Sequence, residues 1–166
     1  YYAPQAWCSD DTDAVERIKI QDGTSYGYAQ SMWGAHVSAV PNDQVGRLTS
    51  IDTRAAVAYF GDFGYELDIT KLPEDQLATI KKQVAFYKQY RHLFQFGKFY
   101  RLENPDTDND NVYGWQVVND DKSAAIAARF QILNGANPAY IRVYFAGLDP
   151  EKTYTVNNGA ELMNVG

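Results

Sequence analysis

The sequence has 166 residues, of which 45% are hydrophobic and 22% are charged, so it can form one globular domain or two small ones. Its net charge of -6 excludes a protein that binds the phosphates of nucleic acids, because such affinity depends on clustered Lys and Arg. No stretch approaches the roughly eighteen apolar residues of a membrane-spanning helix. We therefore expect neither nucleic acid nor a membrane among its partners.

The first part of the chain alternates between helix and strand patterns. Apolar positions at helical spacing predict a short helix over residues 13–21, and alternating polarity before Pro41 predicts a strand over residues 35–40. Residues 54–60 fit a helical turn or a strand, and residues 63–69 fit a further strand.

The clearest element is a long helix that begins at Pro73 and ends near residues 90–94. Pro73 suits a first helical turn, and Glu74 and Asp75 lie at the positive end of the helix dipole. An apolar stripe follows at helical spacing, formed by Leu77, Ile80, Val84 and Tyr87. Together, the alternating strands and helices predict a parallel α/β unit over residues 1–95.

After this helix the pattern changes to short β-prone runs separated by turn residues. These runs are residues 99–102, 112–118, 124–133, 139–145 and 153–156. They predict an antiparallel sheet or sandwich in a second domain, over residues 96–166. Because the sequence begins without Met and stops directly after a predicted strand and turn, we expect a fragment whose second domain is incomplete.

The densest chemistry lies just before the first predicted helix, where the carboxylates of Asp10, Asp11 and Asp13 fall within four residues. One interpretation is structural: Asp10 or Asp13 caps the helix, and Asp13 with Glu16 has the spacing of a capping box. A cap needs only one carboxylate, however, and carboxylates this close raise one another's proton affinity, as general-acid catalysis requires. The cluster therefore predicts either a cap or an acid–base site.

A second acidic run, residues 106–111, resembles the first half of a calcium loop. Asn111 stands where such a loop has Gly, and Val117 stands where it has the bidentate Glu. A solvated turn is the simpler interpretation of this run.

The histidines and the single cysteine do not predict a metal site. His36 lies on a predicted strand, and the only other histidine, His92, lies on the long helix rather than at zinc spacing. Cys8, His36 and an aspartate could form a nucleophilic triad, but no nucleophile elbow is present. We expect no metal and no cofactor. Cys8 cannot form an intrachain disulfide, which fits a reducing compartment.

Three long segments give the sequence a resemblance to a known family. They are WCSDDTDAVER at residues 7–17, GAHVSAVPNDQVGR at 34–47 and TRAAVAYFGDFGYELD at 53–68. On these segments the chain resembles the bacterial α-galactosidases of glycoside hydrolase family 36. The match is close over the first seventy residues and looser to the terminal GLDPEKTYTVN.

The resemblance implies a fold and an activity. Residues 1–95 would be the C-terminal part of a (β/α)8 TIM barrel, with catalytic residues at the carboxyl ends of its strands, and residues 96–166 a β-sandwich domain. The family consists of retaining enzymes that remove terminal α-linked galactose from oligosaccharides such as raffinose and melibiose. We expect a cytoplasmic bacterial location, a galacto-oligosaccharide substrate, and a homo-oligomer for the intact enzyme.

The resemblance also implies a role for individual residues. In the family pattern the Asp that follows Ser in the SDDTD segment is the general acid/base, and here it is Asp10. Trp7, Asp11, Asp13 and His36 are expected to bind the sugar or to support Asp10. Asp13 also lies four residues before Arg17, a spacing that allows the two to pair on a helix.

The departures from the family pattern indicate what is missing. The family's nucleophile is an Asp that follows a Trp on an upstream strand, whereas the Trp residues here are followed by Cys8, Gly34 and Gln116. A glycine-rich segment with Cys and Arg, which helps to hold the sugar in relatives, is also absent. We therefore expect the chain to be inactive without the rest of the barrel.

Two alternative functions remain open from the sequence. A non-catalytic carbohydrate-binding or oligomer-forming β-module would line up aromatic side chains on one exposed face of residues 98–157. A relative that acts on α-N-acetylgalactosamine or transfers galactosyl groups would differ in residues outside this sequence.

Overall fold

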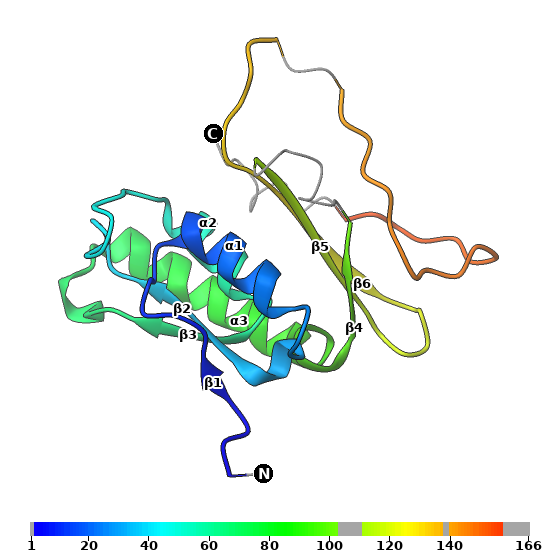
Figure 1. Ribbon diagram of the computed structural model, residues 1–166, viewed down its shortest axis with the longest axis horizontal. Coiled ribbons are helices and arrows are strands. Elements are labelled where there is room, and N and C mark those ends of the chain that lie inside the picture. The colour runs from blue at the N-terminus through cyan, green and yellow to red at the C-terminus, as the bar shows by residue number, and fades with distance from the viewer. Residues whose placement is uncertain (1, 103–110, 138–139, 158–166) are drawn as a thin grey trace. The chain divides into compact units, whose positions relative to one another are not determined.

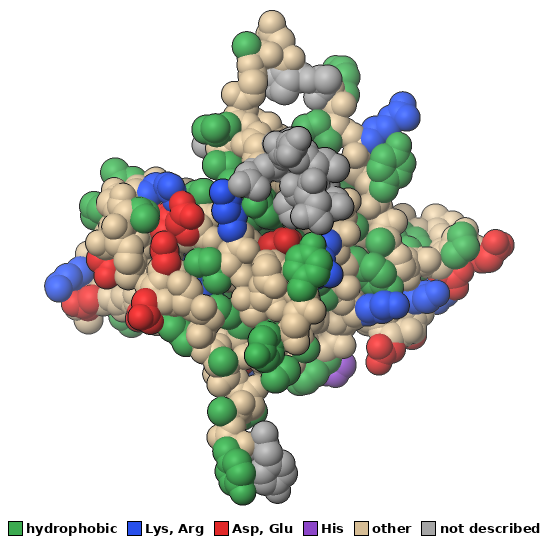
Figure 2. Space-filling view, viewed as in Figure 1, with side chains coloured by type: hydrophobic (Ala, Val, Ile, Leu, Met, Phe, Trp, Pro, Cys, Tyr) green, Lys and Arg blue, Asp and Glu red, His purple; other side chains and the backbone are tan. Residues whose placement is uncertain are grey.

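The structure of the chain is a computed structural model that describes residues 2–102, 111–137 and 140–157. It divides into two compact units, Tyr1–Phe96 and Gly97–Gly166, each with its own sheet (Figure 1). Among the described residues, no helix combines the length and the apolar character needed to cross a membrane. On the face shown in Figure 2, basic side chains are spread over several places rather than gathered in one patch.

The first unit is built on a three-stranded parallel sheet in the order β1-β2-β3. Its strands are β1 (Ala6–Trp7), β2 (Trp33–Ser38) and β3 (Asp62–Glu66). Trp7 of β1 pairs with Gly34, and Ser38 at the end of β2 pairs with Glu66. Because the three strands run in one direction, their carboxyl ends lie along the same edge of the sheet.

Helices follow each strand of this sheet: α1 (Ala14–Thr24), α2 (Ile51–Ala58) and α3 (Glu74–Phe96). Short 3-10 helices, η1 (Gln30–Met32) and η2 (Ile69–Lys71), precede β2 and α3. Alternate residues of β2, Ala35 and Val37, are fully buried, and Tyr65, which pairs with Val37, donates its hydroxyl to Gln83 of α3 at 2.8 Å. This side of the sheet therefore faces the helices, and the opposite side carries His36.

An aromatic cluster, Tyr59, Phe63, Tyr87 and Phe94, packs where α2, β3 and α3 meet. The ring centroids of Tyr59 and Phe63 are 4.9 Å apart, and those of Tyr87 and Phe94 are 5.9 Å apart. Phe94 is only 1% exposed, and the Tyr87 hydroxyl donates to the Gly61 carbonyl at 3.0 Å. Burial of these rings anchors the long helix to the sheet.

Helix caps explain two elements of this unit that differ from, or were left undecided by, the sequence patterns. Residues 54–60, which fit a helical turn or a strand, lie largely in α2, where the Ser50 hydroxyl accepts a hydrogen bond from the Thr53 amide at 3.0 Å. The strand predicted over 63–69 ends at Glu66, because the Asp68 carboxylate then caps η2 by accepting from the Thr70 amide at 3.1 Å.

The second unit contains a three-stranded antiparallel sheet in the order β4-β5-β6. Its strands are β4 (Lys98–Arg101), β5 (Val112–Val118) and β6 (Ala125–Gln131). The ring of Trp115, which is 1% exposed, meets Phe130 edge-on at 4.9 Å and Phe99 at 6.3 Å. This contact forms the core of the unit.

Two of the strands predicted for this unit are wrong. In the part of the chain that the structure describes, residues 140–145 and 153–156 belong to no strand. Instead, the buried side chain of Gln116 donates to the Ala146 carbonyl at 2.7 Å and accepts from the Ala146 amide at 2.9 Å. The Gln116 side chain thus forms the hydrogen bonds with the Ala146 backbone that a neighbouring strand would otherwise form. The second sheet of the expected sandwich stays a prediction.

Candidate active site

The acidic segment, residues 9–16, lies at the carboxyl edge of the parallel sheet. It follows β1 directly and leads into α1, while the loop after β2, residues 39–50, lies against it. In parallel α/β sheets, the loops at the carboxyl ends of the strands form the usual ligand-binding edge. The carboxyl edge of the sheet is therefore the candidate site.

Within residues 9–13, every second side chain accepts a hydrogen bond from a backbone amide of the segment. The Ser9 hydroxyl accepts from the Asp11 amide at 3.1 Å, and the Asp11 carboxylate accepts from the Asp13 amide at 3.0 Å. The Asp13 carboxylate then caps α1 by accepting from the amides of Val15 and Glu16 at 3.0 and 3.1 Å. The capping interpretation therefore holds for Asp13, and Asp11 has a similar local role.

Asp13 is paired with a different arginine from the expected one. Its carboxylate is 1% exposed and forms an ion pair with Arg47, whose guanidinium also lies 3.3 Å from Glu16. The predicted pair with Arg17 is wrong, because Arg17 points across the end of the sheet. There it donates to the carbonyls of Ser9 and Gly34 at 3.3 and 2.6 Å.

Asp10 differs from its two neighbours in its surroundings. Its side chain is exposed, and no hydrogen bond or ion pair to its carboxylate is formed within the described residues. Only its backbone is held: the Asp10 carbonyl accepts from the Gln44 side chain at 2.8 Å. Of the three clustered carboxylates, Asp10 is thus the one that structural contacts leave available.

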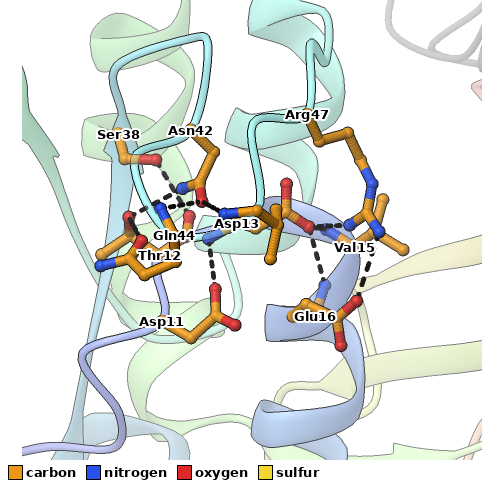
Figure 3. A network of polar contacts seen from close by, with 10 residues as sticks. Asp11, Thr12, Asp13, Val15, Glu16, Ser38, Asn42, Gln44 and Arg47 are labelled. Atoms are coloured by element: carbon orange, nitrogen blue, oxygen red, sulfur yellow. Dashed lines mark hydrogen bonds and ion pairs between the residues drawn. The ribbon is translucent and has the colours of Figure 1, made fainter.

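The contacts from the end of β2 and from the loop after it were not predicted from the sequence. Asn42 donates to the Thr12 hydroxyl at 3.1 Å, and Ser38 donates to the Thr12 carbonyl at 2.9 Å (Figure 3). Gln44 and Arg47 complete the set. The sequence offered one signal for them, a polar run after Pro41 at the end of a predicted strand, but it could not show which residues about thirty positions away the run would meet.

Trp7 and His36 lie together on the side of the sheet opposite the helices. Their ring centroids are 4.6 Å apart, and with Tyr65 and Glu66 they line a small pocket. The His36 ring lies 3.8 Å from the Glu66 carboxylate. Burial lowers the pKa of His36, and the nearby Glu66 opposes that shift. Arg17 stands 5.1 Å from the centroid of the Trp7 ring.

The described residues contain no group of three or more His, Cys, Asp or Glu side chains arranged to hold a metal ion. The calcium-like run at residues 106–111 lies outside the described residues except for Asn111. The Asn111 side chain holds the backbone of Leu133, accepting from its amide at 2.6 Å and donating to its carbonyl at 2.8 Å. The Cys8 side chain interacts with Arg17, and no contact joins it to His36 among the described residues.

A parallel strand–helix unit with an available carboxylate at its carboxyl edge is an arrangement common among glycoside hydrolases. Comparison with family models agrees with this class: residues 1–97 match the model described as Melibiase, and residues 112–166 match the glycosyl hydrolase family 36 C-terminal domain. The chain belongs to glycosyl hydrolase family 36.

Its relatives are α-galactosidases that are much longer than this chain. The α-galactosidase AgaA of Geobacillus stearothermophilus is 51% identical over 171 residues, which cover 100% of this chain and 23% of the relative. The crystal structure of the α-galactosidase from Lactobacillus brevis is 63% identical, with a TM-score of 0.93, and again 100% and 23% of the two chains are covered. A variant of AgaA in complex with raffinose is 54% identical over 90% of this chain and 20% of that one, with a TM-score of 0.86.

Proposed function

We propose that this chain is the C-terminal part of a retaining α-galactosidase that removes terminal α-linked galactose from oligosaccharides of the raffinose and melibiose type. The family match supports this, as does the raffinose bound to a relative. The chain spans only about a quarter of its relatives' length, so the rest of the enzyme would come from residues outside it.

The parallel sheet of residues 1–95 would supply consecutive strands of a (β/α)8 barrel, and residues 96–166 would belong to the β-sandwich domain. The sheet order β1-β2-β3 leaves β1 and β3 as edges, which the remaining barrel strands would pair with. For the intact enzyme we propose a homo-oligomer in the bacterial cytoplasm.

Asp10 would act as the general acid/base. A retaining glycosidase needs two carboxyl groups roughly 5 Å apart, one to attack the anomeric carbon and one to protonate the departing oxygen and later deprotonate water. The observation that carries this assignment is the contrast within the acidic segment: Asp11 and Asp13 accept backbone hydrogen bonds, whereas the Asp10 carboxylate is exposed without such a bond. The nucleophile would lie upstream of this chain.

The other predicted site residues would support this chemistry from different positions. The rings of Trp7 and His36 lie in contact at a tilt beside Glu66, an arrangement suited to contact with a sugar face. Asp11 and Asp13 would act indirectly, by fixing the backbone on either side of Thr12.

Replacing Asp10 with Ala in the full-length enzyme tests the assignment. Cleavage of raffinose, whose leaving group needs a proton, should fall about a hundredfold or more. Aryl galactosides with acidic phenols should lose much less kcat/KM, because their leaving groups depart without a proton.

Added azide should restore turnover of the Asp10→Ala enzyme by attacking the glycosyl-enzyme without needing a base. The expected product is galactosyl azide of α configuration. A β-configured azide would make Asp10 the nucleophile instead, and near-normal raffinose cleavage would reduce Asp10 to a structural residue.

A non-catalytic carbohydrate-binding β-module receives less support. The aromatic side chains on the described strands of the second unit include Tyr113, Trp115 and Phe130, and all three are buried. The exposed aromatic residues described there, Tyr140, Tyr144 and Phe145, lie on an irregular segment rather than on a sheet face. An α-N-acetylgalactosaminidase or a transferase would share the Asp10 chemistry, and product analysis with both sugars separates those from hydrolysis of galactosides.

A further inference from the structure

The backbone around Asp10 is held at both ends of a single peptide plane. The Asp10 carbonyl and the Asp11 amide belong to the same planar peptide unit. The Asp11 amide donates to the Ser9 hydroxyl, and the Asp10 carbonyl accepts from the Gln44 side chain. One end is therefore held by a neighbour in sequence and the other by the loop after β2.

The next alternate peptide plane is held in the same manner. The Thr12 carbonyl accepts from the Ser38 hydroxyl at 2.9 Å, and the Asp13 amide donates to the Asp11 carboxylate at 3.0 Å. Fixing these two planes restricts rotation about the backbone bonds between Asp10 and Asp13. The direction in which the Asp10 side chain leaves the backbone is thereby restricted as well.

Two further hydrogen bonds orient Gln44. Its backbone amide donates to the Asn42 side chain at 3.0 Å, which fixes the turn from which the side chain extends. Its carboxamide oxygen accepts from the Thr12 hydroxyl at 3.4 Å (Figure 3). Its carboxamide nitrogen is thereby turned toward the Asp10 carbonyl, to which it donates at 2.8 Å. A carboxamide can accept and donate in this way at once, whereas a carboxylate of the same shape can only accept.

We propose that Gln44 is a positioning residue for the general acid, because its hydrogen bond to the Asp10 carbonyl directs the Asp10 carboxyl group toward the departing oxygen. The proposal rests on the proposed function of Asp10. Proton transfer depends steeply on the placement of the donor, so a small misplacement lowers the rate of the step that needs the proton. Since Gln44 is exposed and water competes for its hydrogen bond, the effect should be modest.

The test compares two substrates in the full-length enzyme that carries this segment. In Gln44→Ala and in the isosteric Gln44→Glu at neutral pH, kcat/KM for raffinose should fall about tenfold. For a dinitrophenyl α-galactoside, whose leaving group needs no proton, kcat/KM should change less than about twofold. The matched control is Gln89→Ala on the exposed surface of α3, which should leave both values unchanged.

The pattern across the two substrates decides the outcome. An equal loss for both substrates would overturn the proposal, because a general loss of folding or of sugar binding affects them alike. Unchanged raffinose cleavage in both variants would also overturn it. Asp10→Ala is measured in parallel: if it shows the selective loss and the Gln44 variants do not, this inference alone fails, and if Asp10→Ala cleaves raffinose normally, the proposed function itself fails.

Discussion

The acidic segment and the aromatic cluster stabilise the first unit by different interactions. The segment is held by hydrogen bonds from side chains to the backbone and by the ion pair of Asp13 with Arg47, and it leaves the Asp10 carboxylate exposed. The cluster is held by burial of rings such as Phe94, which is 1% exposed. Polar bonds fix the backbone without covering the neighbouring side chains, and this allows the carboxyl edge of the sheet to be both ordered and exposed.

The largest expected effect is the absence of enzymatic activity when the chain is produced without the rest of the enzyme. Of the three clustered carboxylates, only that of Asp10 is left without structural contacts among the described residues, and in the proposed mechanism the nucleophile lies outside this chain. In the described sheet, β1 and β3 are edge strands. The isolated chain should therefore show no turnover of a nitrophenyl α-galactoside, and it should self-associate or bind a hydrophobic dye. Turnover by a preparation free of contaminating enzyme would contradict this prediction.

A large loss of stability is expected from the aromatic cluster. Phe94→Ala removes a buried ring that contacts Tyr59, Phe60, Phe86 and Tyr87. The free energy of unfolding of the first unit should fall by about 3–5 kcal/mol, measured by hydrogen exchange of its strand amides in the full-length protein. Phe96→Ala, which removes a ring that is 62% exposed, is the control and should cost less than about 0.5 kcal/mol.

A smaller loss is expected from the acidic segment. Asp13→Ala removes the cap of α1 and leaves Arg47 without this partner, which should destabilise the helix by about 1–2 kcal/mol. Asp13→Asn keeps a capping oxygen and should cost less. Faster hydrogen exchange of the α1 amides is the measurement. Asp10→Ala should leave that exchange nearly unchanged, and an equal effect of the Asp10 and Asp13 variants would remove the distinction between them.

The smallest effect concerns His36, on the open side of the sheet. Burial disfavours its charged form, so its pKa in the folded protein should lie below the ordinary value of about 6.5. The unfolded chain therefore binds the proton more readily than the folded protein does. As a result, the stability that neutral His36 contributes is present above a pH of about 6.5 and is lost as the pH falls through the pKa of the folded protein. NMR titration of labelled histidine measures this. Glu66→Gln should lower the pKa further, and a value above the ordinary one would contradict the prediction.

Sequence patterns were sufficient to predict an element where several local signals agree. The long helix was predicted correctly because Pro73, the acidic first turn and the apolar stripe are local signals that agree. The run at residues 112–118 was likewise predicted as a strand and is β5. The runs at 140–145 and 153–156 have the same β-prone composition but no neighbouring strand, and strand formation depends on a partner that composition does not specify.

By itself the sequence determined the alternation of strands and helices, the capping potential of Asp13, and the family, because these depend on local spacing and on long matching segments. Only the tertiary structure decided that Asp13 pairs with Arg47 instead of Arg17, and that Gln44 reaches the Asp10 carbonyl. Those contacts join residues about thirty positions apart, and their partners are set by which loops the parallel sheet brings to one edge. Asp10 differs from the two aspartates beside it in part through local hydrogen bonds, because the Asp11 and Asp13 carboxylates accept from backbone amides two or three residues further along the chain. The ion pair of Asp13 with Arg47 adds a difference that only the tertiary structure decides.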